Sequence, residues 1–444
     1  MGFIVGAGRT QGSLFPLALD DLIPTDHVCR VLEAFVDRLD MAGLGFGRAA
    51  PAETGRPGYD PRDLLKLYLY GYLQQVRSSR RLEAECRRNV ELMWLLGRLT
   101  PDHKAIAEFR RLHADAVTQA GTALIAFADS VGLIRGDWVA IDGSKFRAVS
   151  SAKSVGEREA LTRYLAQMDS ADAQDQIDID TTAVAAALEK LAAHPEPEAR
   201  FMRTAGGKVP AYNVQTAVDA EHALIIAQAV TDHAADNRCL QPMAQAARQA
   251  LPDHAGSLKV VADAGYSNGE QARACEEQGI MVHVPANRSV NNQCEGTLLD
   301  RSLFTYDATA DQYTCPAGQT LARKQQHRRD RAVTYGGDAA VCGVCALKPQ
   351  CTLAPRRFIT RHFDDDVLQR MHQRATPDAM RIRRCTVEHP FGTLKYRIFG
   401  HPRFLMRGLR GAQAEFSIAV MAYNLKRMIN ILGHEALTRR LALT

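Results

Sequence analysis

The feature that most constrains this chain is an apolar segment that ends in a carboxylate, residues 138–145 (WVAIDGSK). Its apolar run, followed by Asp142 and the turn-forming Gly143, predicts a strand that is buried on both faces. A second segment of this kind, residues 258–266 (LKVVADAGY), carries Asp263. Because active sites of α/β folds tend to lie at the ends of such strands, we expect Asp142 and Asp263 to form a paired-carboxylate site at one sheet edge.

The length and composition limit the class of protein. A chain of 444 residues exceeds what a single hydrophobic core usually supports, so about two or three domains are expected. A hydrophobic content of 46% and a charged content of 24% are ordinary for a globular protein. The net charge of +5 permits a nucleic-acid partner without requiring one.

Compartment and cysteine chemistry are linked. No apolar run is long enough for a membrane helix, and residues 1–9 lack the charged start and apolar core of a signal peptide, so a cytoplasmic protein is expected. Ten cysteines in such a protein argue against a disulfide framework. Any cysteines that cluster are therefore considered first as metal ligands.

Helical patterns dominate the chain between residue 60 and the Asp142 strand. Asp60-Pro61 is a typical helix start, and shorter amphipathic segments follow over residues 80–88, 90–96 and 102–113. Short helices with tight turns and basic surface positions are typical of helix-turn-helix DNA-binding domains, although an ordinary solvated helix surface is the alternative. The basic residues are Arg80, Arg81, Arg87, Arg88, Lys104, Arg110 and Arg111.

Residues 150–205 are expected to form a solvated helical excursion from the sheet. Aspartates recur at positions 169, 172, 175, 178 and 180, without the glycine and closing glutamate of a calcium loop. The sheet then resumes with a predicted hairpin over 212–219 and 223–231, a helix over 237–251, the Asp263 strand, a helix over 267–278 and a strand over 281–285. The predicted elements therefore follow the order of a ribonuclease-H-like nucleotidyltransferase core: three strands, a helix, a strand, a helix and a strand. The predicted fold class is α/β with a mixed sheet.

Residues 288–366 interrupt this core with a basic, loop-rich segment that contains Cys315, Cys342, Cys345 and Cys351. The two-residue gap between Cys342 and Cys345 lets both thiolates bind one tetrahedral zinc ion, and Cys315 and Cys351 supply two more ligands. A segment with few apolar residues also needs another source of stability, such as a bound metal ion, to remain folded. Isolated thiols are the alternative, and His327 is an alternative ligand within a basic run.

The third carboxylate of interest is Glu388, the only acidic residue between Met380 and Gly411. Taken alone, a carboxylate among bases is most simply a local ion pair. Its place after the fifth strand favours a helical carboxylate that completes a metal site with Asp142 and Asp263, with the neighbouring bases holding phosphates. Glu415 is an alternative, but the apolar pattern around it indicates a solvent-facing residue of a packing helix.

Three motifs carry a resemblance to a known family: residues 140–145 (AIDGSK), 261–266 (VADAGY) and 388–395 (EHPFGTLK). With them the chain resembles, almost end to end, the DDE transposases of bacterial insertion sequences, in particular the eleven-eighty-two group related to the IS-four superfamily. Residues 79–111 also resemble the helical domain of that family. Its helical Tyr, Arg, Glu and Lys motif corresponds here to Arg381, Arg384, Glu388 and Lys395, so only the tyrosine position departs.

The resemblance implies a function and a site. The function is binding of terminal inverted repeats in double-stranded DNA, cleavage at the element's ends and strand transfer into target DNA by a homo-oligomer in the bacterial nucleoid. Asp142, Asp263 and Glu388 are the implied ligands of Mg²⁺ or Mn²⁺, ions that prefer hard oxygen donors. The implied DNA contacts are Arg384, Lys395 and Lys145.

The expected division of the chain is a helical DNA-binding domain over 1–135, the catalytic core over 136–287 and 367–444, and the cysteine-rich insertion over 288–366. Two other functions remain open at this stage. One is a ribonuclease-H-like nuclease of another purpose. The other is a zinc-stabilised DNA-binding protein whose catalytic centre is a relic, which three retained carboxylates disfavour.

Overall fold

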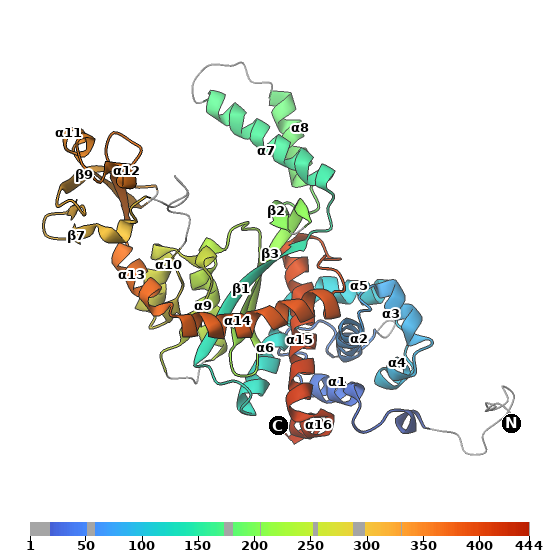
Figure 1. Cartoon of the computed structure of the whole chain (residues 1–444). Helices are drawn as coiled ribbons and strands as arrows, with labels where there is room; N and C mark the ends of the chain where they lie inside the picture. The colour runs from blue at the N-terminus through green and yellow to red at the C-terminus, as the bar shows by residue number, and fades with distance from the viewer. Residues whose placement is uncertain are drawn as a thin grey trace, which may run out of the picture.

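The computed structural model describes residues 18–50, 58–172, 181–204, 206–251, 256–286, 298–329 and 331–443. A helical N-terminal part lies beside a central sheet, a helical pair projects from the sheet, and a second, smaller sheet lies at the opposite end from the N-terminal helices (Figure 1). One continuous group of buried apolar residues extends from Ile23 in the N-terminal part through the central sheet to Leu441. The chain is therefore a mixed α/β protein with a helical N-terminal region.

The N-terminal helices are α1 (Val28–Asp37), α2 (Pro61–Leu73), α3 (Ser79–Cys86), α4 (Val90–Leu95), α5 (His103–Leu112) and α6 (Ala114–Ser130). Of these, α2 to α5 confirm the helical segments predicted over residues 60–113. Asp60 caps α2 by accepting a hydrogen bond from the Arg62 amide, and Asp102 caps α5 through the amides of Lys104 and Ala105. These caps explain why the helices begin where the sequence indicates.

The central sheet has the strand order β2-β3-β1-β5-β6, with β4 also paired to β3. β1 pairs antiparallel with β3 and parallel with β5, and β5 pairs parallel with β6. The predicted hairpin is confirmed as β3 and β4, whereas β2 lies where the helical excursion was expected to continue. The strands are β1 (Trp138–Arg147), β2 (Arg200–Thr204), β3 (Gly207–Asp219), β4 (Ile225–Thr231), β5 (Lys259–Val261) and β6 (Met281–His283).

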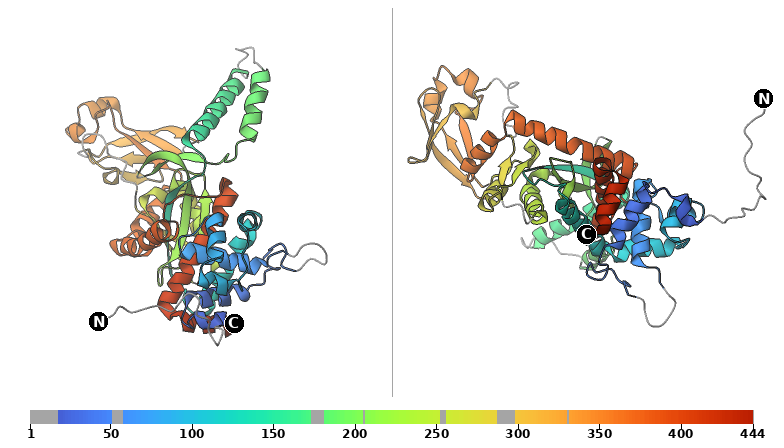
Figure 2. Two further views of the ribbon diagram at one scale, coloured as in Figure 1. Left: turned by 90° about the vertical axis from the view of Figure 1, so that its right-hand side faces the viewer. Right: turned by 90° about the horizontal axis from the view of Figure 1, so that it is seen from below.

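Helices cover this sheet and extend from it. α9 (Leu240–Ala250) and α10 (Gly269–Glu277) confirm the helices predicted over residues 237–251 and 267–278. α7 (Ala152–Asp172) and α8 (Thr181–Ala192) form the projecting pair, which is the expected excursion (Figure 2). Three of its aspartates, Asp175, Asp178 and Asp180, lie outside the described residues. Within the part of the chain that is described, no helix is long and apolar enough to cross a membrane.

The C-terminal helices connect the two sheets to the N-terminal part. α13 (Asp365–Arg374) and α14 (Pro377–Thr393) lead from the small sheet across β1, and a π-helical turn (Leu394–Ile398) follows. α15 (Gly408–Leu432) then packs against α2, α6 and β4, and α16 (His434–Leu443) packs against α1 (Figure 1). α15 therefore joins the N-terminal helices to the sheet.

The prediction that Glu415 faces solvent is wrong. Its side chain is fully buried in α15, where Arg77 lies 2.7 Å away and the amides of Leu405 and Met406 donate hydrogen bonds to it. These three partners compensate the cost of burying its charge. The packing of α15 against helices more than 300 residues away in sequence creates this environment, which the local pattern does not contain.

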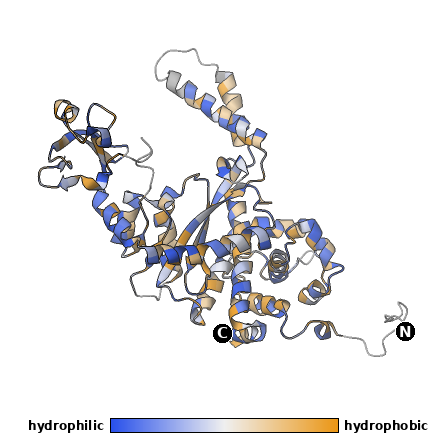
Figure 3. Ribbon diagram, in the orientation of Figure 1, coloured by the Kyte–Doolittle hydropathy of each residue, from blue (hydrophilic) through white to orange (hydrophobic). Residues whose placement is uncertain are grey.

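The expected loop-rich segment over 288–366 also contains a sheet that was not predicted. Residues 305–362 contain a five-stranded antiparallel sheet in the order β11-β10-β9-β8-β7. Burial differs between its strands: in β9 only Leu321 is buried and hydrophilic residues predominate (Figure 3), whereas β10 is largely buried. The elements are β7 (Thr305–Asp307), β8 (Gln312–Thr314), β9 (Thr320–His327), β10 (Ala332–Gly336), β11 (Phe358–His362) and the short helices α11 (Ala339–Gly343) and α12 (Lys348–Cys351).

Candidate active site

The parallel pairing of β1 and β5 brings Asp142 and Asp263 to one edge of the central sheet. Ala140 lies opposite Val261 in this pairing, and each aspartate lies two residues further along its strand. The residues just before each aspartate, Val139 to Ile141 and Val260 to Ala262, are buried; β5 has ended before Asp263, whereas β1 continues past Asp142 to Arg147. Asp263 ends β5 by capping the next turn, with its side chain accepting a hydrogen bond from the Gly265 amide at 2.9 Å.

A single arginine lies between the two carboxylates. Nη2 of Arg383, on α14, is 3.1 Å from Oδ1 of Asp142 and 3.5 Å from Oδ2 of Asp263. α14 is fixed over the strands because Val387 and Ala379 pack in one apolar cluster with Ala140 of β1 and Val261 of β5. The structure therefore holds positive charge at the point where the two aspartates converge.

The electrostatics of Asp142 reflect its position. Burial raises the pKa of its carboxyl group, the positive charge of Arg383 opposes this rise, and the negative charges of Asp263 and Asp236 add to it. Burial also lowers the pKa of Lys395, an effect that the charge of Asp142 opposes. The ionised form of Asp142 is therefore disfavoured by its burial, and a cation bound beside it would stabilise that form.

Beside Asp142 lies a buried polar network that the sequence reasoning missed. Oδ1 of Asp236 accepts hydrogen bonds from Nδ2 of Asn213 at 2.7 Å and from Nε2 of Gln215 at 2.8 Å, and lies 3.2 Å from Nζ of Lys145. The hydroxyl of Tyr266, three residues after Asp263, donates to Oε1 of Gln215. The sequence feature that could have indicated this network is Asn213 and Gln215, two polar residues at alternate positions of a largely apolar strand.

Gly143 is required by this network. A β-carbon at Gly143 would lie 2.3 Å from Nε2 of Gln215 and 2.7 Å from Oδ1 of Asp236, distances too short for atoms that are not bonded. The glycine after Asp142 was predicted to mark a turn, whereas β1 continues through it to Arg147. Its physical role is therefore to let the polar network approach the β1 backbone.

The remaining predicted residues lie at different places around the aspartates. Glu388 and Arg384 are exposed on α14, and Lys395 lies in the π-helical turn with its ammonium group 5.8 Å from the centre of the Phe391 ring. Lys145 is paired with Asp236. Among the described residues, no three His, Cys, Asp or Glu side chains are grouped closely enough to hold a metal ion, so Glu388 is not brought to the two aspartates in this conformation.

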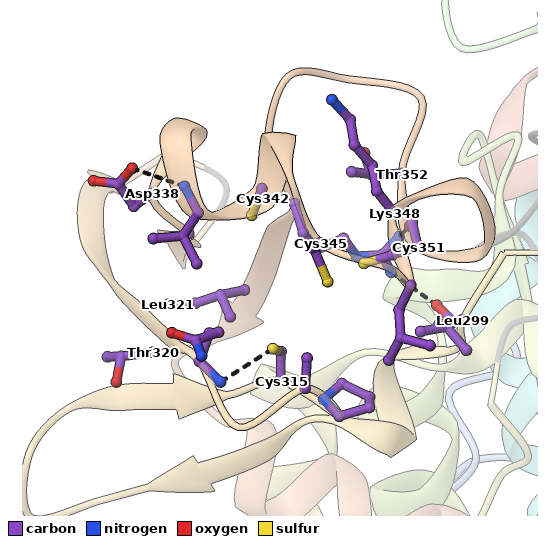
Figure 4. Close-up of a pocket in the computed structure, with 17 residues that line it drawn as sticks. Leu299, Cys315, Thr320, Leu321, Asp338, Cys342, Cys345, Lys348, Cys351 and Thr352 are labelled. Atoms are coloured by element: carbon purple, nitrogen blue, oxygen red, sulfur yellow. Dashed lines mark hydrogen bonds between the residues drawn. The ribbon is translucent and has the colours of Figure 1, made fainter.

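The four predicted zinc ligands line one cavity, although among the described residues they are not close enough together to hold a metal ion as they stand. Cys315, Cys342, Cys345 and Cys351 line one cavity of about 200 Å³ beside the small sheet, and all four are unbridged thiols (Figure 4). Burial raises the pKa of Cys351, the charge of Arg357 opposes this, and the three other cysteines add to the rise. The alternative ligand His327 ends β9 and is not among the described residues that line the cavity.

Of the seven basic residues that were predicted to lie on helix surfaces, all but Arg110 are exposed. Arg110 is buried, with its guanidinium near the hydroxyl of Tyr72 and over the ring of Tyr68, so its predicted surface position is wrong. Arg110 lies four residues after Ile106 on α5, so both side chains lie on the same, buried face of the helix. The exposed residues are Arg80, Arg81, Arg87, Arg88, Lys104 and Arg111.

Comparison with known proteins relates the chain to two families. Residues 172–425, more than half of the chain, match the family model described as "Transposase DDE domain". Residues 17–112 match the model described as "Transposase domain (DUF772)". The first match contains Asp263 and Glu388, whereas Asp142 precedes it.

Comparison with individual proteins adds little to the family matches. No match is found among curated proteins. A solved structure described as a cryo-EM structure of a piggyBac transposase synaptic complex with hairpin DNA is 9% identical. It covers 94% of this chain and 78% of its own, with a TM-score of 0.35, a similarity too low to support an argument about fold or partners.

Proposed function

The chain belongs to the transposase DDE domain family, and from that premise we propose that it binds the terminal inverted repeats of an insertion sequence and catalyses metal-dependent DNA cleavage and strand transfer. The observation that carries this proposal is the convergence of Asp142 and Asp263 on one cation, just beyond the point where the parallel pairing of β1 with β5 ends. Membership of the family indicates DNA transposition; the repeat-specific binding and the metal dependence are our proposal.

The topology of the central sheet supports a ribonuclease-H-like core. In chain order, β1, β3 and β4 are antiparallel neighbours, and β5 and β6 then extend the sheet on the other side of β1 in parallel. α9 and α10 are the intervening helices. The two aspartates would then occupy the first and fourth strands of that core, which is the arrangement expected from the sequence.

The residues present at the aspartates fit a divalent metal ion. Arg383 is a natural stand-in, because its guanidinium already places one positive charge between the two carboxylates. Carboxylate oxygens are the donors that Mg²⁺ and Mn²⁺ prefer. Asp142 and Asp263 would hold the ion, and a metal bound there would supply activation of the attacking hydroxyl and stabilisation of the leaving oxygen.

Glu388 remains our proposed third ligand. Among the described residues it has no hydrogen-bond or ion-pair partner, so its carboxylate is not held in another interaction. It lies on the same helix as Arg383, which already reaches both aspartates. A change in the position or rotation of α14 would therefore affect Arg383 and Glu388 together.

The basic residues of the site would hold DNA. Arg384 is exposed beside Glu388, and Lys395 lies within the electrostatic range of Asp142, so both suit contacts with phosphates next to the cleaved bond. Lys145 is engaged with Asp236 and would orient the strand that carries Asp142. Once the aspartates hold a metal ion, the guanidinium of Arg383 would be available to a phosphate oxygen.

A cleavage assay tests the proposal. A labelled duplex carrying the element's terminal repeat is incubated with Mg²⁺, Mn²⁺ or neither, using the wild type, Glu388→Gln and the control Glu277→Gln on the exposed face of α10. We expect metal-dependent nicking at the repeat boundary by the wild type and the control, and loss of nicking with retained binding in Glu388→Gln. Full cleavage by Glu388→Gln would exclude Glu388 as a ligand.

The same assay separates the two alternatives. Cleavage of any duplex, with no preference for the terminal repeat, would indicate a nuclease of another purpose. Repeat binding without cleavage in either metal would indicate a DNA-binding protein with an inactive centre. Neither outcome depends on which residue is the third ligand.

A further inference from the structure

The four cysteines beside the small sheet come from three separate structural elements. Cys315 follows β8, Cys342 lies in α11 with Cys345 shortly after it, and Cys351 ends α12. All four sulfur atoms turn toward the same cavity (Figure 4). Thiols from distant positions that converge on one space are the donor set of a structural zinc site.

The turns that carry these cysteines suit thiolate ligands. After Cys315 the chain folds back, with the Gly318 amide donating to the Cys315 carbonyl at 2.8 Å and the Gln319 amide donating to the Cys315 sulfur at 3.3 Å. A backbone amide that donates to sulfur stabilises the negatively charged form. The Cys345 amide donates to the Cys342 carbonyl, a turn that leaves both thiols of this pair on the cavity side (Figure 4).

Cationic side chains surround the same cavity. Lys348 and Arg357 are among its lining residues. Arg357 is held beside Cys351, because its guanidinium donates to the carbonyls of Cys351 at 2.8 Å and Leu299 at 3.1 Å. Four thiolates around one zinc ion carry a net double negative charge, which two nearby cations would offset.

The small sheet has little else to stabilise it. Its buried core consists of Phe304, Tyr313, Leu321, Val333, Tyr335 and Ile359, with Cys315 and Cys351 packed against it. Domains with so small a core usually require a metal ion or disulfides. α11 and α12 are short and contain no buried residue among those described, so a metal ion would be what fastens them to the sheet.

We propose that Cys315, Cys342, Cys345 and Cys351 bind one structural Zn²⁺ ion that fastens α11 and α12 to the small sheet. In the present conformation the four sulfurs are gathered but not closed into a metal-binding group. Binding would therefore draw them together by side-chain rotation within the cavity. This site is separate from the aspartates, so it goes beyond the proposed catalytic function and is testable without any DNA substrate.

The first measurement is the metal content of the full-length chain, purified under reducing conditions without added zinc. We expect one zinc per chain in the wild type, and close to none in Cys342→Ser or Cys345→Ser. Cys385→Ser is the matched control, because Cys385 is an exposed thiol on α14, outside the cavity. Its variant should retain one zinc per chain.

A second measurement avoids variants that fail to fold. The wild type is stripped with a chelator and titrated with Co²⁺ under anaerobic conditions, and the visible spectrum is recorded. A tetrahedral four-thiolate site gives intense absorption that saturates at one Co²⁺ per chain and disappears when one equivalent of Zn²⁺ is added. Octahedral Co²⁺ at the aspartates absorbs only weakly, so the two metal sites are distinguishable.

Three results would overturn the proposal. One is a wild type that contains no zinc and gives no thiolate spectrum with Co²⁺. Another is a thiol count showing that the four cysteines are paired as disulfides in the protein as isolated from cells. Equal zinc content in the wild type and all four single Cys→Ser variants would also exclude these residues as ligands.

Discussion

Nη2 of Arg383 lies 3.1 Å from Oδ1 of Asp142, at the point where a catalytic metal ion would bind. The guanidinium and the ion would compete for the same carboxylate oxygens. In the metal-free protein Arg383 reduces the repulsion between Asp142 and Asp263, and it must release them when a metal ion binds. Under the proposed function, Arg383 would therefore affect both the binding of the metal ion and the contact with DNA phosphates.

This competition predicts that Arg383→Ala strengthens metal binding to the DNA-free protein. Removing a half-buried ion pair worth about 1 kcal/mol should tighten Mn²⁺ binding by roughly fivefold, measured by calorimetry. Arg384→Ala is the control, since Arg384 is the exposed neighbour on the same helix, and it should leave the affinity unchanged. Equal or weaker Mn²⁺ binding by Arg383→Ala would show that the arginine does not occupy the metal position.

The raised pKa of Asp142 predicts that Asp142→Asn stabilises the metal-free protein at neutral pH. Burial raises the pKa of this carboxyl group above its ordinary value of 3.8, so the folded state binds protons more tightly than the unfolded state. The ionised aspartate therefore costs stability at pH values above the folded-state pKa. This cost shrinks as the pH falls through the folded-state pKa and is absent below about 3.8.

We expect the melting temperature of Asp142→Asn at pH 7 to exceed that of the wild type by about 2 °C, the shift that roughly 1 kcal/mol gives in a chain of this size. The gain should disappear as the pH is lowered toward 4. Mn²⁺ should raise the melting temperature of the wild type more than that of the variant. A variant that is less stable than the wild type at pH 7 without metal would contradict this account.

The burial of Glu415 predicts a large loss of stability when its ion pair with Arg77 is broken. Arg77→Ala leaves a buried carboxylate with only its two amide donors, which should cost about 3 kcal/mol of unfolding free energy. Urea denaturation of the metal-free protein measures this cost. Arg80→Ala, at an exposed position of α3, is the control and should change the unfolding free energy by less than about 0.5 kcal/mol.

The same variants separate a structural role for Glu415 from a catalytic one. Because Glu415 is enclosed by Arg77 and two amides, we expect Glu415→Gln to bind Mn²⁺ as the wild type does while unfolding at lower urea concentration. Loss of Mn²⁺ binding in a folded Glu415→Gln protein would instead make Glu415 a candidate third ligand.

The close approach at Gly143 predicts that Gly143→Ala damages the site. The added methyl group would displace Gln215 and Asp236, which bond to each other and, through Asp236, to Lys145 on the strand that carries Asp142. We therefore expect DNA cleavage to fall by about 100-fold, the order of loss that misplaced catalytic groups cause. Gly156→Ala is the matched control. It lies within α7 with open space around it and should leave cleavage unchanged. Unimpaired cleavage by Gly143→Ala would mean that the network does not position Asp142.

The elements that could be predicted from sequence are those with a local signal. The strands before Asp142 and Asp263 were predicted because fully buried parallel strands are continuous apolar runs. The N-terminal helices were predicted because capping residues such as Asp60 and Asp102 lie immediately before them. The sheet over residues 305–362 was missed because its strands are short and half exposed, so basic and polar residues obscure their alternation.

By itself, the sequence determined the two aspartate-bearing strands, the clustering of four cysteines and the family motifs. Each is a property of neighbouring residues, and the backbone converts it directly into a strand, a turn or a helix. Only the tertiary structure decided that Arg383 lies between the aspartates, that Asp236 supports the strand carrying Asp142, and that Glu415 is enclosed. These contacts join residues more than 80 positions apart, and their distances depend on how helices pack on the sheet, which no local pattern encodes.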